Sequence, residues 1–398
     1  MMNRAYQIYA ILRERQFVFA TEGGLSLPKN KIEAGIELLV ETMEVKEDDS
    51  ILDLNCGYGA IGIVAAAAAP RGNVTLTTPD IRAVQLAQQN IKRNRLLNAE
   101  ALLADEPGDE DEVFDVILMW HAAHLGKDFC FEMIQKSKRC LKMGGAFYIA
   151  IKTKKGAKSV ASFMERIYGN VETVEKSQGY RILKSIRKPD AGEEIEESYE
   201  YQITTELLGK SYTFQTRPGV FSRKKIDAGT LLLIETMNIR ESDTVLDLGC
   251  GYGPLGVVAS HIAHKGEVFL VDTNIRAIRC ARHNIAANGC HNARAYVSDG
   301  FEAVNGIDFD VICSNPPTHS GKDVILPFIR GSYRQLKSKG QIFLVVAKPQ
   351  MYLKMLQQTF GNAEIIRQSE RYTVISAVKT RRINYIQRET HYEKILCS

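Results

Sequence analysis

The amino-acid sequence contains an internal duplication, and this feature restricts the possible folds more than any other. The matching pairs are 31–35 (KIEAG) with 225–229 (KIDAG), 51–62 (ILDLNCGYGAIG) with 245–256 (VLDLGCGYGPLG), and 114–117 (FDVI) with 309–312 (FDVI). The spacing between partners stays nearly constant along the chain of 398 residues, a length that suits two domains. Because the units of a solenoid are much shorter, the pattern predicts two copies of one fold.

Each copy alternates between apolar runs that favour strands and segments with helical spacing. In the second copy, residues 244–248 and 268–272 are apolar and rich in β-formers, whereas 254–264 and 276–288 carry helical spacing. This alternation predicts an α/β fold with a mostly parallel sheet flanked by helices. A proline, a glycine and an acidic run interrupt the apolar pattern near 188–197, so we predict one domain over residues 1–190 and another over 191–398.

Composition argues against several kinds of protein. The formal net charge of +4 does not suit a surface that coats nucleic acid everywhere, although it allows a local basic patch. The eight cysteines form no C-x-x-C pair and no histidine cluster has zinc-ligand spacing, so we expect reduced thiols in a cytoplasmic protein without a metal site. The longest apolar run, 60–69, is too short to cross a bilayer and the first residues do not suggest an export signal, so we expect no membrane attachment.

A glycine-rich turn follows the first strand of the second copy. Gly249, Gly251 and Gly253 permit positive φ and let a ligand approach the backbone, and the helix that follows offers free N–H groups to an anion. Asp272 ends the next strand, about 20 residues on, where an acid can accept hydrogen bonds from both hydroxyls of a ribose. The pattern indicates a nucleotide site, and a purely structural strand-to-helix turn is the alternative.

The most specific motif is Asn315-Pro316-Pro317, which follows the strand predicted at 309–313. Consecutive prolines cannot continue a sheet, so they fix a turn at its carboxyl edge, where ligands of α/β proteins bind. Asn315 is then held so that its side-chain carbonyl can accept a hydrogen bond from an exocyclic amine. Positioning of such an amine, rather than a strong general base, would supply most of the rate. The alternative is a turn that only ends a strand.

These motifs resemble those of a known family. The Gly-x-Gly-x-Gly spacing with the leading Asp247 resembles the nucleotide loop of class I S-adenosylmethionine (SAM)-dependent methyltransferases. The tandem halves, the segment 214–222 (FQTRPGVFS) and the Asn-Pro-Pro motif resemble the small-subunit ribosomal RNA guanine-N2 methyltransferases and their large-subunit relatives. The resemblance covers nearly the whole chain. It implies two tandem Rossmann-like class I methyltransferase domains, of which the second is catalytic and the first is a degenerate copy that supports folding and RNA engagement.

The resemblance also implies roles for individual residues. The implied cofactor-binding residues are Asp247, Gly249, Cys250, Gly251, Gly253, Asp272, Asn315 and Asp299, the last beside the adenine amine. The implied catalytic residues are Asn315, Pro316, Pro317 and His319, and the implied substrate-binding residues are Phe221, Thr318 and Lys322. Bacterial members of the family have an aromatic residue at the position of Thr318, so we expect Phe221 or Tyr252 to stack on the target base instead. Ordinary polar loop positions are the alternative for His319 and Lys322.

The first copy lacks the residues that the second copy is expected to use. Trp120-His121-Ala122 stands at the position of the Asn-Pro-Pro motif, Thr78 at that of Asp272, and Asn55 at that of Gly249. We therefore expect a scaffold, although the rest of the glycine loop persists and leaves residual SAM binding open. The basic stretches 152–158 and 181–188 are candidates for RNA backbone contacts, with ordinary solvated faces as the alternative.

From these features we predict a SAM-dependent methyltransferase that acts on an exocyclic amine of RNA, namely guanine N2 of small-subunit ribosomal RNA. Its expected partner is that RNA or the small ribosomal subunit, and we expect a monomer with intramolecular pairing of its domains. A protein glutamine amide and a DNA adenine amine stay open as substrates with a similar conjugated nitrogen. A non-catalytic RNA-binding or assembly factor is the alternative from another class. The tail 381–398 fits either a docked extension or an RNA contact.

Overall fold

The computed structural model describes residues 6–22, 31–108, 111–121, 125–193, 197–316 and 322–380, with side chains from Ile325 onward in the last stretch. The elements of the first copy are β1 (Tyr6–Leu12), β2 (Arg15–Thr21), α1 (Ala34–Thr42), β3 (Ser50–Leu54), α2 (Ala60–Ala68), β4 (Asn73–Thr78), α3 (Ile81–Arg93), β5 (Ala99–Leu103), β6 (Phe114–Trp120), α4 (Lys127–Cys140), β7 (Leu141–Lys152), α5 (Ala157–Tyr168), β8 (Glu172–Ser177) and β9 (Tyr180–Ile186). The elements of the second copy are β10 (Tyr201–Leu207), β11 (Lys210–Thr216), α6 (Ala228–Ile234), β12 (Thr244–Leu248), α7 (Pro254–Ile262), β13 (Glu267–Asp272), α8 (Ile275–Ala287), β14 (Ala293–Val297), η2 (Glu302–Val304), β15 (Phe309–Ser314), α9 (Lys322–Gln335), β16 (Leu336–Val346), α10 (Pro349–Phe360), β17 (Glu364–Gln368) and β18 (Thr373–Val378).

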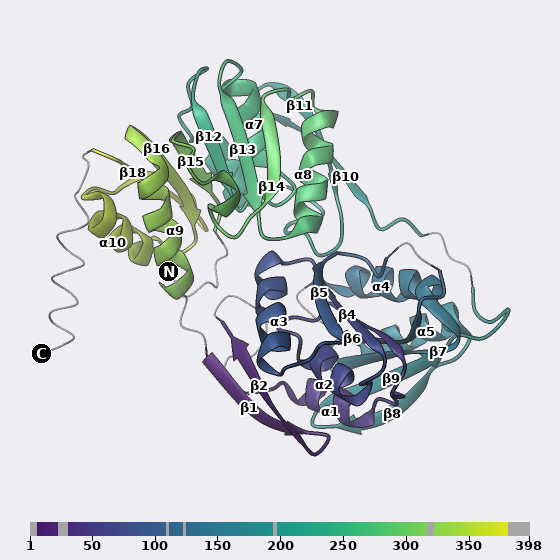
Figure 1. Cartoon of the computed structure of the whole chain (residues 1–398). Helices are drawn as coiled ribbons and strands as arrows, with labels where there is room; N and C mark the ends of the chain where they lie inside the picture. The colour runs from purple at the N-terminus through teal and green to yellow at the C-terminus, as the bar shows by residue number, and fades with distance from the viewer. Residues whose placement is uncertain are drawn as a thin grey trace, which may run out of the picture.

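Each copy is built on a seven-stranded sheet, and the two sheets have the same strand order. The orders are β5-β4-β3-β6-β7-β9-β8 and β14-β13-β12-β15-β16-β18-β17. The first five strands of each order pair in parallel, and the last two pairings of each order are antiparallel. The predicted tandem α/β fold is therefore confirmed (Figure 1). Strand order reverses between β12 and β15, so the carboxyl ends of these two strands border the point where open α/β sheets bind ligands.

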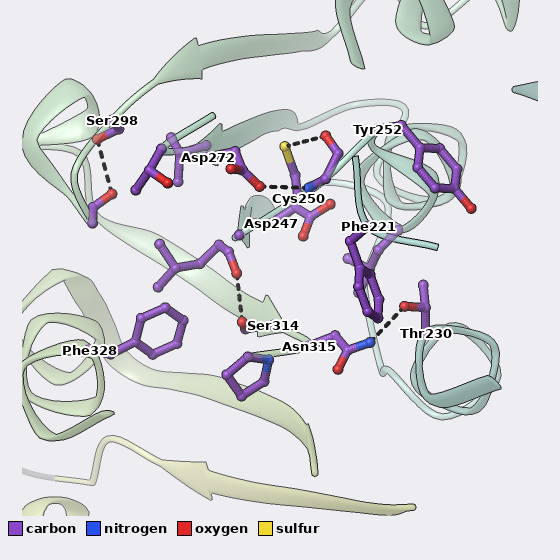
Figure 2. A pocket seen from close by; sticks show the side chains of 18 of the residues that line it. Phe221, Thr230, Asp247, Cys250, Tyr252, Asp272, Ser298, Ser314, Asn315 and Phe328 are labelled. Carbon is purple, nitrogen blue, oxygen red and sulfur yellow. Dashed lines mark hydrogen bonds between the residues drawn. The ribbon is translucent and has the colours of Figure 1, made fainter. Parts of the chain in front are cut away.

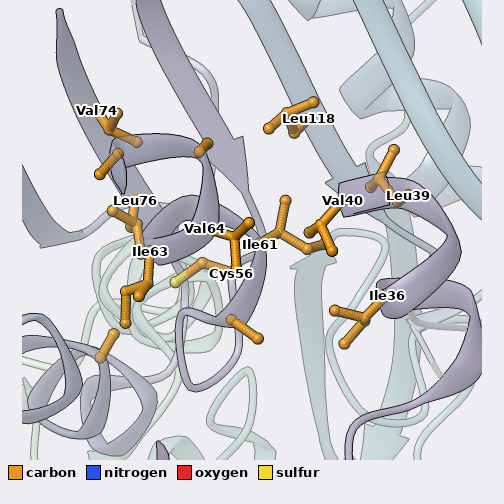
Figure 3. Close-up of a cluster of buried hydrophobic side chains, with 14 of the residues drawn as sticks. Ile36, Leu39, Val40, Cys56, Ile61, Ile63, Val64, Val74, Leu76 and Leu118 are labelled. Atoms are coloured by element: carbon orange, nitrogen blue, oxygen red, sulfur yellow. The ribbon is translucent and has the colours of Figure 1, made fainter. Parts of the chain in front are cut away.

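Helices cover both faces of each sheet. In the first copy, Leu39, Ile63 and Val84 from α1, α2 and α3 join a buried core on one face, part of which Figure 3 shows. Met133 and Phe163 from α4 and α5 belong to the core on the other face. Because both faces are covered, the central strands are continuous apolar runs, as buried parallel strands usually are.

The observed elements closely follow the predicted ones in the second copy. The predicted strand 244–248 is β12, and the strand predicted at 268–272 begins one residue earlier, as β13. Helix α8 begins at Ile275 because Asn274 caps it, with the Asn274 side chain accepting a hydrogen bond from Arg276 N at 2.9 Å. The predicted domain boundary at residue 190 lies in the connection between β9 and β10. Within the stretches described above, no helix is long and apolar enough to span a membrane.

The two copies meet where α3 and α8 begin (Figure 1). Ile81 N donates to Thr273 O at 3.0 Å, and Ile275 N donates to Pro79 O at 2.9 Å. The exchange is reciprocal, so an approximate twofold rotation relates the copies at this contact. As a result, the start of α3 lies beside the carboxyl edge of the second sheet.

Candidate active site

The three glycines after β12 have different structural roles. Gly249, Gly251 and Gly253 have φ of 79°, 57° and 86°, a region that other residues rarely adopt. A Cβ added at Gly249 or Gly251 would meet no described atom within 4 Å, whereas one at Gly253 would lie 3.0 Å from Leu270 Cδ2. The first two glycines therefore leave space beside the backbone, and the third allows α7 to pack closely on the sheet.

Two acids fix the shape of this loop. Asp272 accepts hydrogen bonds from Gly251 N and Asn274 N, both at 2.9 Å. Loss of hydration raises the pKa of Asp272, and these two backbone bonds oppose the shift. Asp247 is buried, accepts from Gly256 N at 2.9 Å, and has its pKa raised to about 7 by burial. It thereby ties the first turn of α7 to β12.

The Asn315 side chain is held in one orientation. Its Nδ2 donates to Asp227 Oδ2 and to Thr230 Oγ1, both at 3.0 Å. Asp227 also caps α6, where it accepts from Gly229 N at 2.8 Å, and it accepts from Tyr372 OH at 3.3 Å. An ionised carboxylate only accepts hydrogen bonds, so the amide nitrogen must face it. None of the described residues donates to Asn315 Oδ1, which is left to accept from another donor.

The glycine loop and the Asn315 turn face each other across one cavity of about 580 Å³ (Figure 2). A hydrogen bond of 2.6 Å from Ser314 Oγ to Leu248 O joins the ends of the two strands that carry these turns. Among the predicted site residues, the following line the cavity: Phe221, Asp247, Gly249, Cys250, Gly251, Asp272, Asp299, Asn315 and Pro316. Pro317, Thr318 and His319 lie outside the described residues, as does the side chain of Lys322.

Two of the predicted residues serve the fold in ways the sequence did not indicate. Gly253 is not among the cavity residues and instead allows the close contact with Leu270. The Cys250 thiol is buried and contacts Gly251 O at 3.4 Å, and burial raises its pKa, so Cys250 reaches the cavity as a neutral residue.

The aromatic candidates for base stacking differ in exposure. Phe221 lines the cavity and is 64% exposed. Tyr252 also lines the cavity, but its ring is buried against Phe214, with the ring centres 5.9 Å apart. Phe221 is therefore the side chain with a free aromatic face.

Several cavity residues were not identified from the sequence. Thr230 and Tyr372 hold Asn315 directly or through Asp227, and Phe328 forms part of the wall (Figure 2). Arg82 also lines the cavity, although it belongs to the first copy. A signal for Arg82 was present, because it is repeated in the second copy as Arg276.

The corresponding place in the first copy is filled by aromatic rings. Trp120 stands where the second copy has Asn315, and its ring centre lies 5.6 Å from that of Tyr180. Tyr180 OH donates to Glu33, the counterpart of Asp227, and Lys152 pairs with Glu33 at 3.1 Å. A Cβ on Gly35 would lie 2.7 Å from the Trp120 ring, so the space is closely packed.

Metal-ligating side chains do not form clusters among the described residues. No group of three or more histidine, cysteine, aspartate or glutamate side chains among them has a metal-binding arrangement. All seven cysteines that the structure describes are buried.

The fold and the cavity at the switch point of the second sheet define a tandem Rossmann-like α/β protein of the methyltransferase type. The chain belongs to the methyltransferase small domain family, whose model matches residues 18–184 and 211–376. A solved structure of the T. thermophilus 16S rRNA N2 methyltransferase RsmC, in complex with AdoMet and guanosine, is similar over 92% of this chain and 96% of that chain. Its sequence identity is 26% and its TM-score is 0.78.

Curated relatives match about one copy of the duplication. An uncharacterized protein of Bacillus subtilis (strain 168), YbxB, is 33% identical over 178 residues, which are 44% of this chain and 89% of that protein. The ribosomal RNA small subunit methyltransferase C of Salmonella choleraesuis (strain SC-B67) is 38% identical over 173 residues, which are 42% of this chain and 50% of that protein. The match thus spans half the length of the Salmonella protein.

Proposed function

We propose that this chain transfers a methyl group from SAM to the exocyclic N2 amine of guanine in small-subunit ribosomal RNA. The single observation that carries the proposal is the shared cavity, in which the glycine loop and Asn315 face each other. The similarity to RsmC supports the substrate, since that structure is of a 16S rRNA N2 methyltransferase in complex with AdoMet and guanosine. The identity to the Salmonella methyltransferase C supports the same assignment.

The residues around the cavity fit SAM. A volume of about 580 Å³ lies within the usual range for small-molecule sites. Gly249 and Gly251 leave room for the methionine part of SAM against the backbone. Asp272 keeps lone pairs on both carboxylate oxygens for the ribose hydroxyls, and Asp299 would accept from the adenine amine. We assign these four residues to cofactor binding.

When bound, SAM supplies a methyl group on a sulfonium, ready for attack by a nucleophilic nitrogen. Asn315 Oδ1 and the Pro316 backbone carbonyl would accept the two N–H groups of the guanine amine and aim its lone pair across the cavity. Asp227, Thr230 and Tyr372 are positioning residues, because they hold the Asn315 amide without reaching the base. The rate then comes mainly from orientation and from excluding water.

The target base would stack on Phe221, the exposed aromatic residue of the cavity. Stacking on aromatic side chains is the usual way to hold an unstacked RNA base. We also propose that the target base is contacted by Pro317, Thr318, His319 and Lys322.

For the RNA backbone, the two basic stretches of the first copy are unequal. Lys154, Lys155 and Lys158 are exposed and precede or begin α5. In the second stretch, Lys184 is paired with Glu44 at 2.6 Å and Arg187 with Glu112 at 3.2 Å. We therefore assign the phosphate contacts to the three lysines. We further propose that the enzyme is monomeric and cytoplasmic, with a scaffold over residues 1–190 and a catalytic unit over residues 191–398.

The test uses the full chain with methyl-labelled SAM and small-subunit RNA that lacks the modification. Wild type should label guanine N2, as mapped by mass spectrometry of nuclease digests. Asn315→Ala should lower kcat by roughly 10²–10³-fold, because a positioned acceptor is lost, while the Kd for SAM changes less than about threefold. Asn305→Ala, at an exposed asparagine outside the cavity, should behave as wild type.

Other outcomes identify the alternatives. Label on a glutamine amide or on DNA adenine would replace the RNA substrate while keeping the chemistry. Calorimetry that detects no SAM binding to wild type would reject the enzyme and favour a non-catalytic assembly factor.

A further inference from the structure

Arg82 and Arg276 occupy the same position in the two copies, near the start of α3 and of α8. Because these helix starts lie against each other across the approximate twofold, each arginine is placed at the border of the opposite copy. The two side chains nevertheless have very different surroundings.

Arg276 crosses into the first copy and is fully buried there. Its guanidinium donates to Glu132 at 2.5 Å and to the Asp105 carbonyl at 2.5 Å, and lies 5.1 Å from the centre of the Phe129 ring. Asp105 is the counterpart of Asp299, and Glu132 is the counterpart of Pro327, which also lines the cavity of the second copy. An arginine from the second copy thus occupies the part of the first copy that corresponds to the adenine end of the cavity.

Arg82 belongs to the first copy and lines the cavity of the second copy. Its Nη2 pairs with Asp80 at 3.1 Å, and its backbone N donates to the same carboxylate at 2.9 Å. The residues that cap the two helices differ: Arg82 forms an ion pair with Asp80, the cap of α3, whereas the cap of α8 is Asn274 and Arg276 pairs with acids of the first copy. Asp80 is fixed in turn by the second copy, since Thr273 Oγ1 donates to it at 3.3 Å.

We propose that Arg82 is a cofactor-binding residue that the first copy supplies to the SAM site of the second. It shares the cavity wall with Asp272, Thr273 and Asp299, the residues at the ribose and adenine end. A guanidinium is planar, stacks on aromatic rings and donates hydrogen bonds in its plane, so it suits contact with the adenosine of SAM. The side chain is only 18% exposed and is braced by Asp80, which lowers the entropy lost on binding.

This inference rests on the proposed function of the cavity and adds a direct task for the first copy. A copy without its own Asn-Pro-Pro motif would still be required for full cofactor affinity. It also explains why the cofactor site spans the contact between the copies rather than lying within one of them.

The experiment measures the binding of SAM and of its demethylated product, S-adenosylhomocysteine, to the full chain by calorimetry. Arg82→Ala should raise both Kd values about tenfold, or roughly 1.4 kcal/mol. Arg82→Lys should lie between Arg82→Ala and wild type, since it keeps a charge and loses the planar fork. At saturating SAM, kcat should change less than about twofold. Thermal unfolding of each variant verifies that it folds.

Arg279→Ala is the matched control. Arg279 lies on α8, is half exposed, and forms another ion pair between the copies, with Asp105, away from the cavity. Its removal should leave both Kd values unchanged. Equal weakening by Arg279→Ala and Arg82→Ala would assign the effect to a loosened contact between copies and overturn the inference, as would an unchanged Kd in Arg82→Ala. Wild type that binds neither ligand would instead reject the proposed function.

Discussion

The two copies have the same strand end in the same fold, but its surroundings differ among the described residues: in the second copy it borders a cavity, and in the first it is packed with aromatic rings. In the second copy, Asn315 follows β15, and Asp227 and Tyr372 hold it beside an open cavity. In the first copy the acid and the tyrosine persist as Glu33 and Tyr180, but Trp120 fills the place of the asparagine. The acid–tyrosine contact therefore belongs to the fold, and the residue at the strand end decides whether a site exists.

The buried aspartates of the two copies lead to the same conclusion. Asp53 accepts from Gly62 N at 2.8 Å and Asp247 from Gly256 N at 2.9 Å, and burial raises the pKa of each to about 7. Asp247, which the resemblance assigns to cofactor binding, therefore also has a structural task. The first copy keeps its counterpart Asp53, although that copy lacks the other site residues.

Asn315→Trp would convert the working strand end into its counterpart and should have the largest effect. The indole would enter the cavity and remove the amine acceptor, so kcat should fall by roughly 10³-fold or more. The Kd for SAM should also rise, unlike in Asn315→Ala, because volume is lost. Steady-state methylation and calorimetry measure the two effects, and Trp120→Phe in the first copy is the control. A tryptophan variant with wild-type kcat would show that this strand end does not decide activity.

Arg276→Met tests the other contrast, between the buried arginine and the cavity arginine. The variant keeps most of the side-chain volume but removes the buried cation from Glu132 and Asp105, which retain only the partly exposed Lys136 and Arg279. Loss of one partner of a buried ion pair typically costs about 3–5 kcal/mol. For a chain of this length, the midpoint of thermal unfolding should shift down by roughly 5 °C. Removing the half-exposed Arg279 should cost no more than about 1 kcal/mol. Equal shifts in the two variants would mean that the buried contact does not hold the copies together.

The sequence predicted what depends on local pattern. The strand at 244–248, the glycine loop and the turn at Asn315 follow from apolar runs and from backbone restrictions of glycine and proline. The facing of the two turns also followed, because parallel strands end at one edge of a sheet.

The remaining site residues depend on contacts that no local pattern contains. Tyr372 reaches Asp227 across 145 residues of chain. Arg82 reaches the cavity only because the copies pack at the starts of α3 and α8, and a duplicated sequence does not specify how its halves pack. The choice between Phe221 and Tyr252 also required burial, which separates two aromatic residues that the sequence treats alike.

Asp53→Asn sharpens the comparison of the buried aspartates with the smallest expected effect. The pKa of Asp53 is raised in the folded chain, so between about pH 4 and pH 7 the folded state holds a proton that the unfolded state has released. Stability must then fall as pH rises through this window, by roughly 2 kcal/mol between pH 5 and pH 7 for each such aspartate. The asparagine carries no charge, so the variant should lose the part of the decline that Asp53 causes and keep the parts that Asp247 and the other acids with raised pKa, such as Asp272, cause. Unfolding measured at several pH values compares it with Asp48→Asn, at an exposed carboxylate, which should leave the slope unchanged. A slope in Asp53→Asn equal to that of wild type would mean that the first copy stabilises ionised Asp53 in a way its single hydrogen bond from Gly62 does not explain.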